Sequence, residues 1–113
     1  MIIAGVIPCY KTPNKALKVV SQSYKYLDMV ICVDDCCPFN TGKEIENNFD
    51  DNKVRVLYHP KNKGVGGAMK TGIKYALESG AKIIVKIDSD GQMSPDLIPS
   101  LINPIKSGSV SYT

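Results

Sequence analysis

The sequence is poor in the residue types on which several function classes depend. It has no tryptophan, two phenylalanines and one histidine among 113 residues, so stacking against nucleobases would fall to its six tyrosines. Its 14 Lys and Arg residues exceed its 11 Asp and Glu residues only slightly, giving a net charge of +3. These basic residues are spread along the chain, whereas nucleic-acid binders gather them in patches. We therefore expect no nucleic-acid partner.

The cysteines lack the spacing of a zinc site. Cys36 and Cys37 are adjacent, Cys9 and Cys32 lie within apolar runs, and no two cysteines form a CxxC pair. Structural zinc sites use such pairs, so we expect reduced and buried thiols instead. Reduced thiols are typical of cytosolic proteins.

A long apolar segment is also missing, since no run approaches the roughly 18 apolar residues of a membrane span. The opening MIIAGVIP has no basic segment before it and is interrupted by Pro8, so we interpret it as a strand and not as a signal peptide. We expect a cytoplasmic protein, with peripheral attachment to the inner face of a membrane left open.

The chain does have two alternating hydrophobic periodicities. Short runs rich in Ile and Val, typical of strands buried on both faces, occupy residues 2–7, 29–33, 54–58 and 82–87. Each run is followed by a segment in which apolar residues recur with helical spacing. The first of these segments begins at Thr12-Pro13, the second covers 41–49, the third covers 66–79 and the last begins at Ser94. This βαβαβαβα order predicts an α/β fold, a Rossmann-like sandwich with a mostly parallel sheet covered by helices. With 43% hydrophobic residues, we expect one domain over residues 1–113.

The third helical segment carries an apolar stripe that we expect to face the sheet. It consists of Met69, Ile73, Ala76 and Leu77, and Gly80 would end the helix as a C-cap.

Three of the predicted strands end in residues suited to ligand binding. Pro8-Cys9-Tyr10 follows the first, Asp34-Asp35 the second and Asp88-Ser89-Asp90 the fourth. Parallel sheets bind ligands outside the carboxyl ends of their strands. We therefore expect these segments to meet at one edge of the sheet.

Asp88 and Asp90 are separated by one residue. Side chains at i and i+2 of an extended segment point the same way, so both carboxylates can face one point. Two oxygen ligands with open positions beside them suit Mg²⁺ or Mn²⁺. Gly91 permits a tight turn that would let Gln92 add an amide oxygen. The spacing alone fits an acidic turn equally well, so both interpretations stay open.

Asp34 and Asp35 are adjacent and point to opposite faces of a regular strand, so they cannot clamp one metal together. One of them could accept a hydrogen bond from a ligand, such as the imide N–H of a uracil. Asp34 could instead cap the turn at Cys36-Cys37-Pro38. The two roles are compatible if each carboxylate takes one of them.

Residues 62–68, NKGVGGA, lead into a helix and could bring backbone N–H groups near a phosphate. The segment follows the third strand, and Met69 replaces the last glycine of GxGxxG, so a dinucleotide-binding fingerprint is a poor match. Close packing of loop and helix on the sheet is at least as good an explanation. We interpret His59 as a strand-end residue. Nearby lysines either help to neutralise a diphosphate or are solvated charges: Lys11, Lys61, Lys63 and Lys70.

Taken together, four ordered segments resemble the nucleotide-sugar-binding half of family 2 glycosyltransferases with the GT-A fold. They are VIPCYK at 6–11, VDDCCPFNTG at 33–42, NKGVGGAMKTGIKYA at 62–76 and KIDSDGQMSPDLIPSLINPI at 86–105. The last segment is most similar to dolichyl- or polyprenyl-phosphate mannose synthases. The resemblance covers nearly the whole chain, and the joint match is far more specific than any one motif.

The resemblance implies an inverting transfer of a sugar from a GDP- or UDP-sugar, in lipid-linked sugar or cell-envelope polysaccharide synthesis. Asp88 and Asp90 would be the catalytic DxD acids that hold Mg²⁺ or Mn²⁺, with Gln92 as a third metal ligand. The donor would be bound by five residues, of which Asp35 contacts the base: Pro8, Tyr10, Asp35, Gly64 and Ser89. The acceptor stays unknown, with polyprenyl phosphate or a glycan as the implied classes.

Two departures from the family pattern are visible. Cys36-Cys37-Pro38 stands where members usually have a glycine-serine turn, so we expect a reshaped loop beside the base. Members also continue for about as long again beyond SVSYT into an acceptor-binding region. One alternative is therefore a truncated, non-catalytic remnant or oligomerising subunit, with a second copy or a partner chain covering the missing half. A phosphoacceptor receiver domain fits less well, because its acid pair follows the first strand.

Overall fold

A computed structural model of the chain describes residues 2–10, 13–36, 38, 40–49, 52–89 and 97–100. It contains one four-stranded sheet whose strands are all parallel, in the order β3-β2-β1-β4. The predicted α/β class with a parallel sheet is thereby confirmed. The strands are β1 (Ile2–Cys9), β2 (Met29–Asp34), β3 (Val54–Tyr58) and β4 (Ala81–Lys86).

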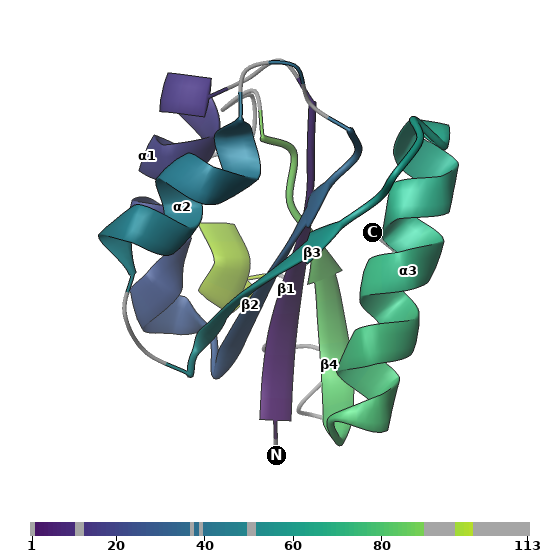
Figure 1. Cartoon of the computed structure of the whole chain (residues 1–113). Coiled ribbons are helices and arrows are strands. Elements are labelled where there is room, and N and C mark those ends of the chain that lie inside the picture. Colours follow the sequence, from purple (N-terminus) through teal and green to yellow (C-terminus); the bar gives the residue numbers. More distant parts are fainter. Residues whose placement is uncertain are drawn as a thin grey trace.

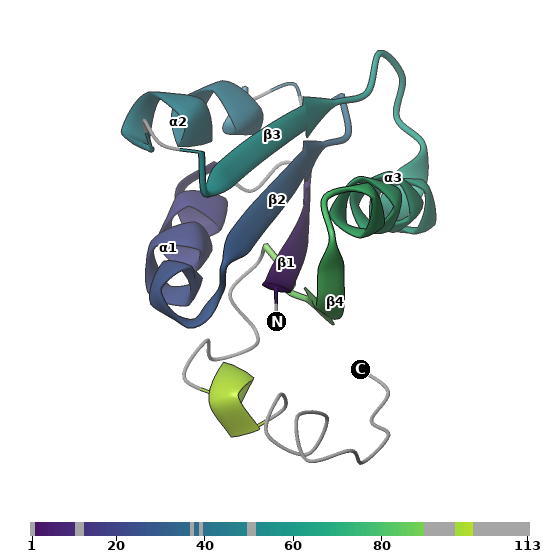
Figure 2. The same cartoon turned by 90° about the horizontal axis from the view of Figure 1, so that it is seen from below.

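Helices cover both faces of this sheet. Figures 1 and 2 show the helices of residues 13–23 and 41–48 on one face and the helix of residues 64–78 on the other face. The first face carries α1 (Pro13–Ser23), which continues into a 3-10 turn η1 (Tyr24–Tyr26), and α2 (Thr41–Asn48). The opposite face carries α3 (Gly64–Glu78). Of the helix predicted from Ser94, the structure describes 97–100, where Ile98 is buried in the core on the α1 side.

Strand β1 reaches Cys9, beyond the predicted end at residue 7. Pro8 and Cys9 stay in register with Val33 and Asp34 of β2. Proline cannot donate to a sheet ladder, yet here it is tolerated because β4 already ends at Lys86, which is paired with Val6. Because of this extension, β1 ends beside the end of β2, so the final residues of both strands lie at the same edge of the sheet.

The buried face of α3 differs from the one predicted. Its fully buried residues are the small Ala68, Gly72 and Ala76, whereas Leu77 is 60% exposed. The reason is the close approach of helix and sheet: a Cβ on Gly72 would lie 2.3 Å from Val6 Cγ1. Only small residues fit such a contact, so the larger apolar side chains lie on the flanks of the helix.

The cysteines only partly follow the prediction of buried thiols. Cys9 and Cys32 are free and buried, as expected, but Cys36 is free and exposed. Cys36 lies just after the end of β2, with a positive φ of 59°. Cys37 lies outside the described residues. Within the parts of the chain that the structure describes, no helix is long and apolar enough to cross a membrane.

Candidate functional site

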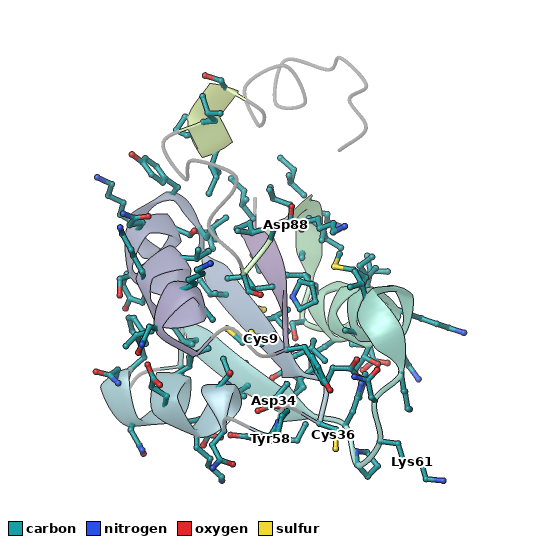
Figure 3. All side chains as sticks on the ribbon, turned by 90° about the horizontal axis from the view of Figure 1, so that it is seen from above. Cys9, Asp34, Cys36, Tyr58, Lys61 and Asp88 are labelled. Atoms are coloured by element: carbon teal, nitrogen blue, oxygen red, sulfur yellow. The ribbon has the colours of Figure 1, made fainter. Side chains whose placement is uncertain are left out.

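The carboxyl ends of the strands meet at one edge of the sheet. The register pairs Asp34 of β2 with Cys9 of β1 on one side and with Tyr58 of β3 on the other. Figure 3 looks onto this edge and shows Tyr58, Asp34, Cys9 and Asp88 in the order of their strands. Backbone hydrogen bonds extend the pairing one step further, from Asp35 N to Cys9 O (3.1 Å) and from His59 N to Asp34 O (2.9 Å).

A cavity of about 210 Å³ opens at this edge. The chain crosses from β1 to β2 and β3, then returns to β4 on the other side of β1, so the strand order reverses between β1 and β4. Parallel sheets bind ligands at such a reversal. Five of the predicted site residues line the cavity, together with Cys9, Val65 and Ala68: Pro8, Tyr10, Asp35, Asp88 and Ser89.

The adjacent acids Asp34 and Asp35 point into different surroundings. Asp34 Oδ2 accepts a hydrogen bond from the backbone N–H of Gly42 at 2.9 Å, so this carboxylate holds the first turn of α2 against the end of β2. Asp35 is buried, 4% exposed, and lines the cavity. Asp34 thus contacts the start of α2, and Asp35 is the acid placed at the cavity.

Asp35 belongs to a buried chain of hydrogen bonds. Its Oδ1 accepts from His59 Nδ1 and from the backbone N–H of Lys63, both at 2.8 Å. The other ring nitrogen, His59 Nε2, lies 2.8 Å from the hydroxyl of Thr71. Thr71 Oγ1 in turn donates to the carbonyl of Gly67 at 3.1 Å. The chain of contacts thus joins the ends of β2 and β3 to the first half of α3.

The pKa of Asp35 lies below its ordinary value. Burial acts to raise this pKa, because it disfavours the charged carboxylate. Four interactions lower the pKa and together outweigh burial. They are the side-chain hydrogen bond from His59, the hydrogen bonds from the backbone N–H groups of Lys63 and Gly64, and the charge of His59. Asp35 is therefore an ionised hydrogen-bond acceptor at neutral pH.

The glycine-rich segment places the start of α3 beside the cavity. Gly64 has a φ of +77°, which side chains other than glycine rarely adopt, and its N–H donates to Asn62 Oδ1 at 2.9 Å. Val65 and Ala68 of the first turns line the cavity, whereas Gly64 itself does not. Gly64 therefore shapes the turn that delivers α3 to the site.

Asp88 and Ser89 enter the site directly after β4. The Asp88 side chain is half exposed, and its Oδ1 lies 3.9 Å from Lys86 Nζ. Ser89 is buried, 8% exposed. Asp90 and Gln92, the other predicted metal ligands, lie outside the described residues. Within the described residues no three His, Cys, Asp or Glu side chains gather into a metal site. Asp88 supplies one accessible carboxylate, a ligand type that Mg²⁺ and Mn²⁺ accept.

His59 is the site residue whose role sequence reasoning missed. The sequence predicts only a residue at the end of a strand, whereas in the structure its ring is buried and contacts both Asp35 and Thr71. A signal was present, because consecutive strands are usually neighbours in a sheet. The observed register pairs Tyr58 with Asp34, so the residue after Tyr58 falls beside the residue after Asp34.

Comparison with known proteins identifies the family to which the sequence is similar. Residues 6–113 match the model of glycosyl transferase family 2. The chain is 42% identical to UDP-N-acetylglucosamine--dolichyl-phosphate N-acetylglucosaminyltransferase of Methanococcus voltae, over 98% of this chain and 50% of the relative. It is 29% identical to dolichol-phosphate mannosyltransferase of Pyrococcus furiosus, over 96% of this chain and 31% of the relative. The chain thus spans 50% and 31% of the lengths of these two relatives.

Solved structures share the fold at low sequence identity. Residues 1–349 of Staphylococcus aureus TarS superpose with a TM-score of 0.72 at 20% identity, covering 95% of this chain and 33% of that one. The same TarS segment in complex with UDP gives a TM-score of 0.67, again at 20% identity. These structures bear out the predicted GT-A type of sheet. With the family model matched over nearly the whole sequence, the chain belongs to glycosyl transferase family 2.

Proposed function

We propose that this chain binds the nucleoside diphosphate part of a nucleotide sugar and presents the sugar for glycosyl transfer. The observation that carries the proposal is the cavity at the reversal of strand order, which joins Tyr10, Asp35 and Asp88 from three strand ends. Membership in glycosyl transferase family 2 supports the same class of ligand. So does the naming of a UDP-sugar in the Methanococcus relative and of UDP in the TarS complex.

In this proposal the nucleoside lies in the cavity. Ligand pockets for whole small molecules usually hold about 300–1,000 Å³. The cavity here, of about 210 Å³, suits one part of a sugar nucleotide, with the remainder extending past Asp88. Pro8 and Tyr10 form one wall, and Asp35 accepts a hydrogen bond from the base. Tyr10 is 38% exposed, so its ring is accessible for stacking on that base.

The diphosphate and its cation would be held after β4. Asp88, Asp90 and Gln92 would bind Mg²⁺ or Mn²⁺, and the half-exposed Asp88 carboxylate fits that role. A bound divalent cation supplies charge stabilisation to the leaving diphosphate. Ser89 and the turn at Gly64 complete the donor site, because Ser89 lines the cavity and Gly64 directs α3 towards it.

The proposed reaction transfers the sugar with inversion. An acceptor oxygen forms a bond to the anomeric carbon while the bond from that carbon to the diphosphate breaks. The nucleoside diphosphate leaves with the electron pair. A hydroxyl acceptor would pass its proton to a base, whereas an ionised phosphate acceptor has no proton to lose at the attacking oxygen. Several relatives carry names that state a polyprenyl-type acceptor, such as the undecaprenyl-phosphate mannosyltransferase of Micrococcus luteus. A polyprenyl phosphate is therefore the acceptor class we propose, with peripheral membrane attachment as its consequence.

Calorimetric titration of the full chain with UDP and GDP tests donor binding. We expect binding of at least one of them with Mn²⁺ and at least about tenfold weaker binding in EDTA. Asp88→Asn and Asp90→Asn should each weaken the Mn²⁺-dependent binding to a similar degree. Asp28→Asn is the matched control, because Asp28 lies at the opposite end of the sheet, where its Oδ2 accepts from Ile3 N at 2.8 Å. Equal affinity in Mn²⁺ and EDTA would refute the metal-dependent site.

A second candidate function is an assembling subunit that keeps the fold without transfer activity. The specific observation is β4, which pairs with β1 on one side and with no other strand of the described residues on the other. Open strand edges readily pair with further strands. Sedimentation of the chain over a wide concentration range should then show a dimer or a larger species. A monomer at every concentration would exclude this candidate.

A further inference from the structure

We infer that Lys86 is a further donor-binding residue, whose ammonium group pairs with the diphosphate of the bound nucleotide sugar beside Asp88. This inference rests on the proposed function, because it names a protein group that meets the diphosphate at that same site. It concerns a lysine of β4, whereas the sequence draws attention to lysines near the glycine-rich segment. The contact that carries it is an ion pair between Lys86 and an acid that lines the cavity.

Lys86 and Asp88 project from the same side of the sheet. Ile84, two residues before Lys86, packs against the apolar cluster on the α3 side, whereas Ile87 is buried in the cluster on the α1 side. The backbone stays paired past the end of β4, because Ile87 N donates to Val6 O at 3.0 Å. Side chains alternate along such a segment, so Lys86 and Asp88 both lie on the α3 side. The cavity is on that side too, since residues of α3 line it.

The two charged side chains meet beside the cavity. Lys86 Nζ lies 3.9 Å from Asp88 Oδ1, and the side chains are 41% and 50% exposed. Both charged ends are therefore accessible to a ligand that arrives from solvent. An ion pair with this exposure contributes little to stability. Asp88 can thus exchange the ammonium group for a divalent cation at small cost.

The charges of the proposed complex leave room for a further cation. Of the described residues that line the cavity, the two charged ones, Asp35 and Asp88, are both acidic. A divalent cation held by Asp88 and Asp90 carries fewer positive charges than these two carboxylates and a diphosphate carry negative ones. Phosphate oxygens form their strongest hydrogen bonds with charged donors. An ammonium group next to the metal-binding carboxylate therefore stabilises the bound diphosphate.

Lys86 is the described lysine whose position meets this requirement. Within the part of the chain that the structure describes, two ion pairs involve a lysine, Lys43 with Glu46 and Lys86 with Asp88. The first belongs to α2, and only the second includes a residue that lines the cavity. When Asp88 binds the metal, the ammonium group loses this partner. Its flexible four-carbon side chain can then turn to the diphosphate held by the same metal.

Calorimetric titration of the full chain with UDP and Mn²⁺ tests the assignment. Lys86→Gln removes the charge and should weaken UDP binding at least about fivefold. Lys86→Arg keeps the charge and should stay closer to wild type than Lys86→Gln. The exposed Lys82 provides the matched control, because it lies at the opposite end of the same strand. That position is roughly 13 Å away, beyond the Debye length of about 8 Å at 0.15 M salt, so Lys82→Gln should change UDP binding by less than about twofold.

Equal UDP affinities of Lys86→Gln and Lys82→Gln would overturn the inference while leaving donor binding intact. The same holds if Lys86→Arg binds UDP as weakly as Lys86→Gln. If the wild-type chain binds GDP and not UDP, the series is run with GDP. Failure of the wild-type chain to bind either nucleotide would overturn the proposed function together with the inference.

Titration with Mn²⁺ alone separates contact with the diphosphate from mere support of Asp88. Paramagnetic broadening of the Ser89 amide signal in the ¹⁵N-labelled chain reports metal bound at the neighbouring Asp88. If Lys86 only oriented Asp88, Lys86→Gln would need more Mn²⁺ for the same broadening, and the assignment would be wrong. We expect the opposite sign, with at least about twofold less Mn²⁺ needed, because the competing positive charge is gone. Weaker UDP binding together with tighter Mn²⁺ binding in one variant is the expected signature.

Discussion

At the residue scale, the carboxylates of Asp34 and Asp35 lie in different surroundings although they are neighbours in the chain. Asp34 contacts the start of α2 through Gly42, whereas Asp35 contacts His59 and Lys63 at the cavity. Alternation along an extended strand predicts that they point apart. The partners of each acid depend on which loops return to that edge, and short-range pattern does not contain this information.

The lowered pKa of Asp35 makes a contribution to stability that depends on pH. Because the folded pKa lies below the unfolded value of about 3.9, the ionised group stabilises the fold fully above that value. This contribution is lost as the pH falls through the folded pKa. We expect Asp35→Asn to lower the free energy of unfolding by about 1–2 kcal/mol at pH 7, since charge-assisted bonds become neutral ones.

Urea denaturation at a series of pH values measures this effect. The gap between wild type and Asp35→Asn should be widest at neutral pH and should narrow as the pH falls below about 4. A gap of constant size down to pH 2.5 would show that the charge of Asp35 does not matter to the fold. Asp28→Asn reports the effect of removing an exposed carboxylate far from the cavity.

At the element scale, hydrophobic periodicity predicts the position of α3 correctly but predicts only part of its buried face. The helix, its approximate limits and its end near Gly80 follow from the sequence, and so does the burial of Ala76. Periodicity favoured the large residues Met69 and Leu77 for the buried face. The structure instead buries the side with Gly72, because the helix approaches β1 and β2 closely enough to exclude a Cβ there.

Substitution of two glycines of α3 tests this close packing. Gly72→Ala should destabilise the fold by about 1–3 kcal/mol, because overpacking exceeds the gain of about 1 kcal/mol in helix propensity. A Cβ there would lie 2.3 Å from Val6 Cγ1 and 3.3 Å from Val33 Cγ2. Gly66→Ala is the matched control, since a Cβ at Gly66 meets nothing within 4 Å. Thermal unfolding of both variants measures the difference, and a Gly72→Ala as stable as Gly66→Ala would contradict the packing.

At the scale of the whole molecule, the order of strands and helices was predictable from alternating periodicity. The limits predicted for β3, residues 54–58, agree with the structure, and the meeting of three strand ends follows from a parallel sheet. The role of His59 did not follow, because its partner Asp35 lies 24 residues away in the sequence. Such pairings depend on the lengths of the connections as much as on the residues themselves.

The central claim is that the edge where β1, β2 and β4 end binds a nucleotide. Titration of the ¹⁵N-labelled full chain with UDP and Mg²⁺, followed by amide NMR shifts, tests it most directly. We expect the largest shifts at the cavity and small ones over α1 and α2, with these amides affected most: Cys9, Tyr10, Asp35, Val65 and Ser89. Shifts confined to the face covered by α1 and α2, or none at millimolar UDP, would contradict it.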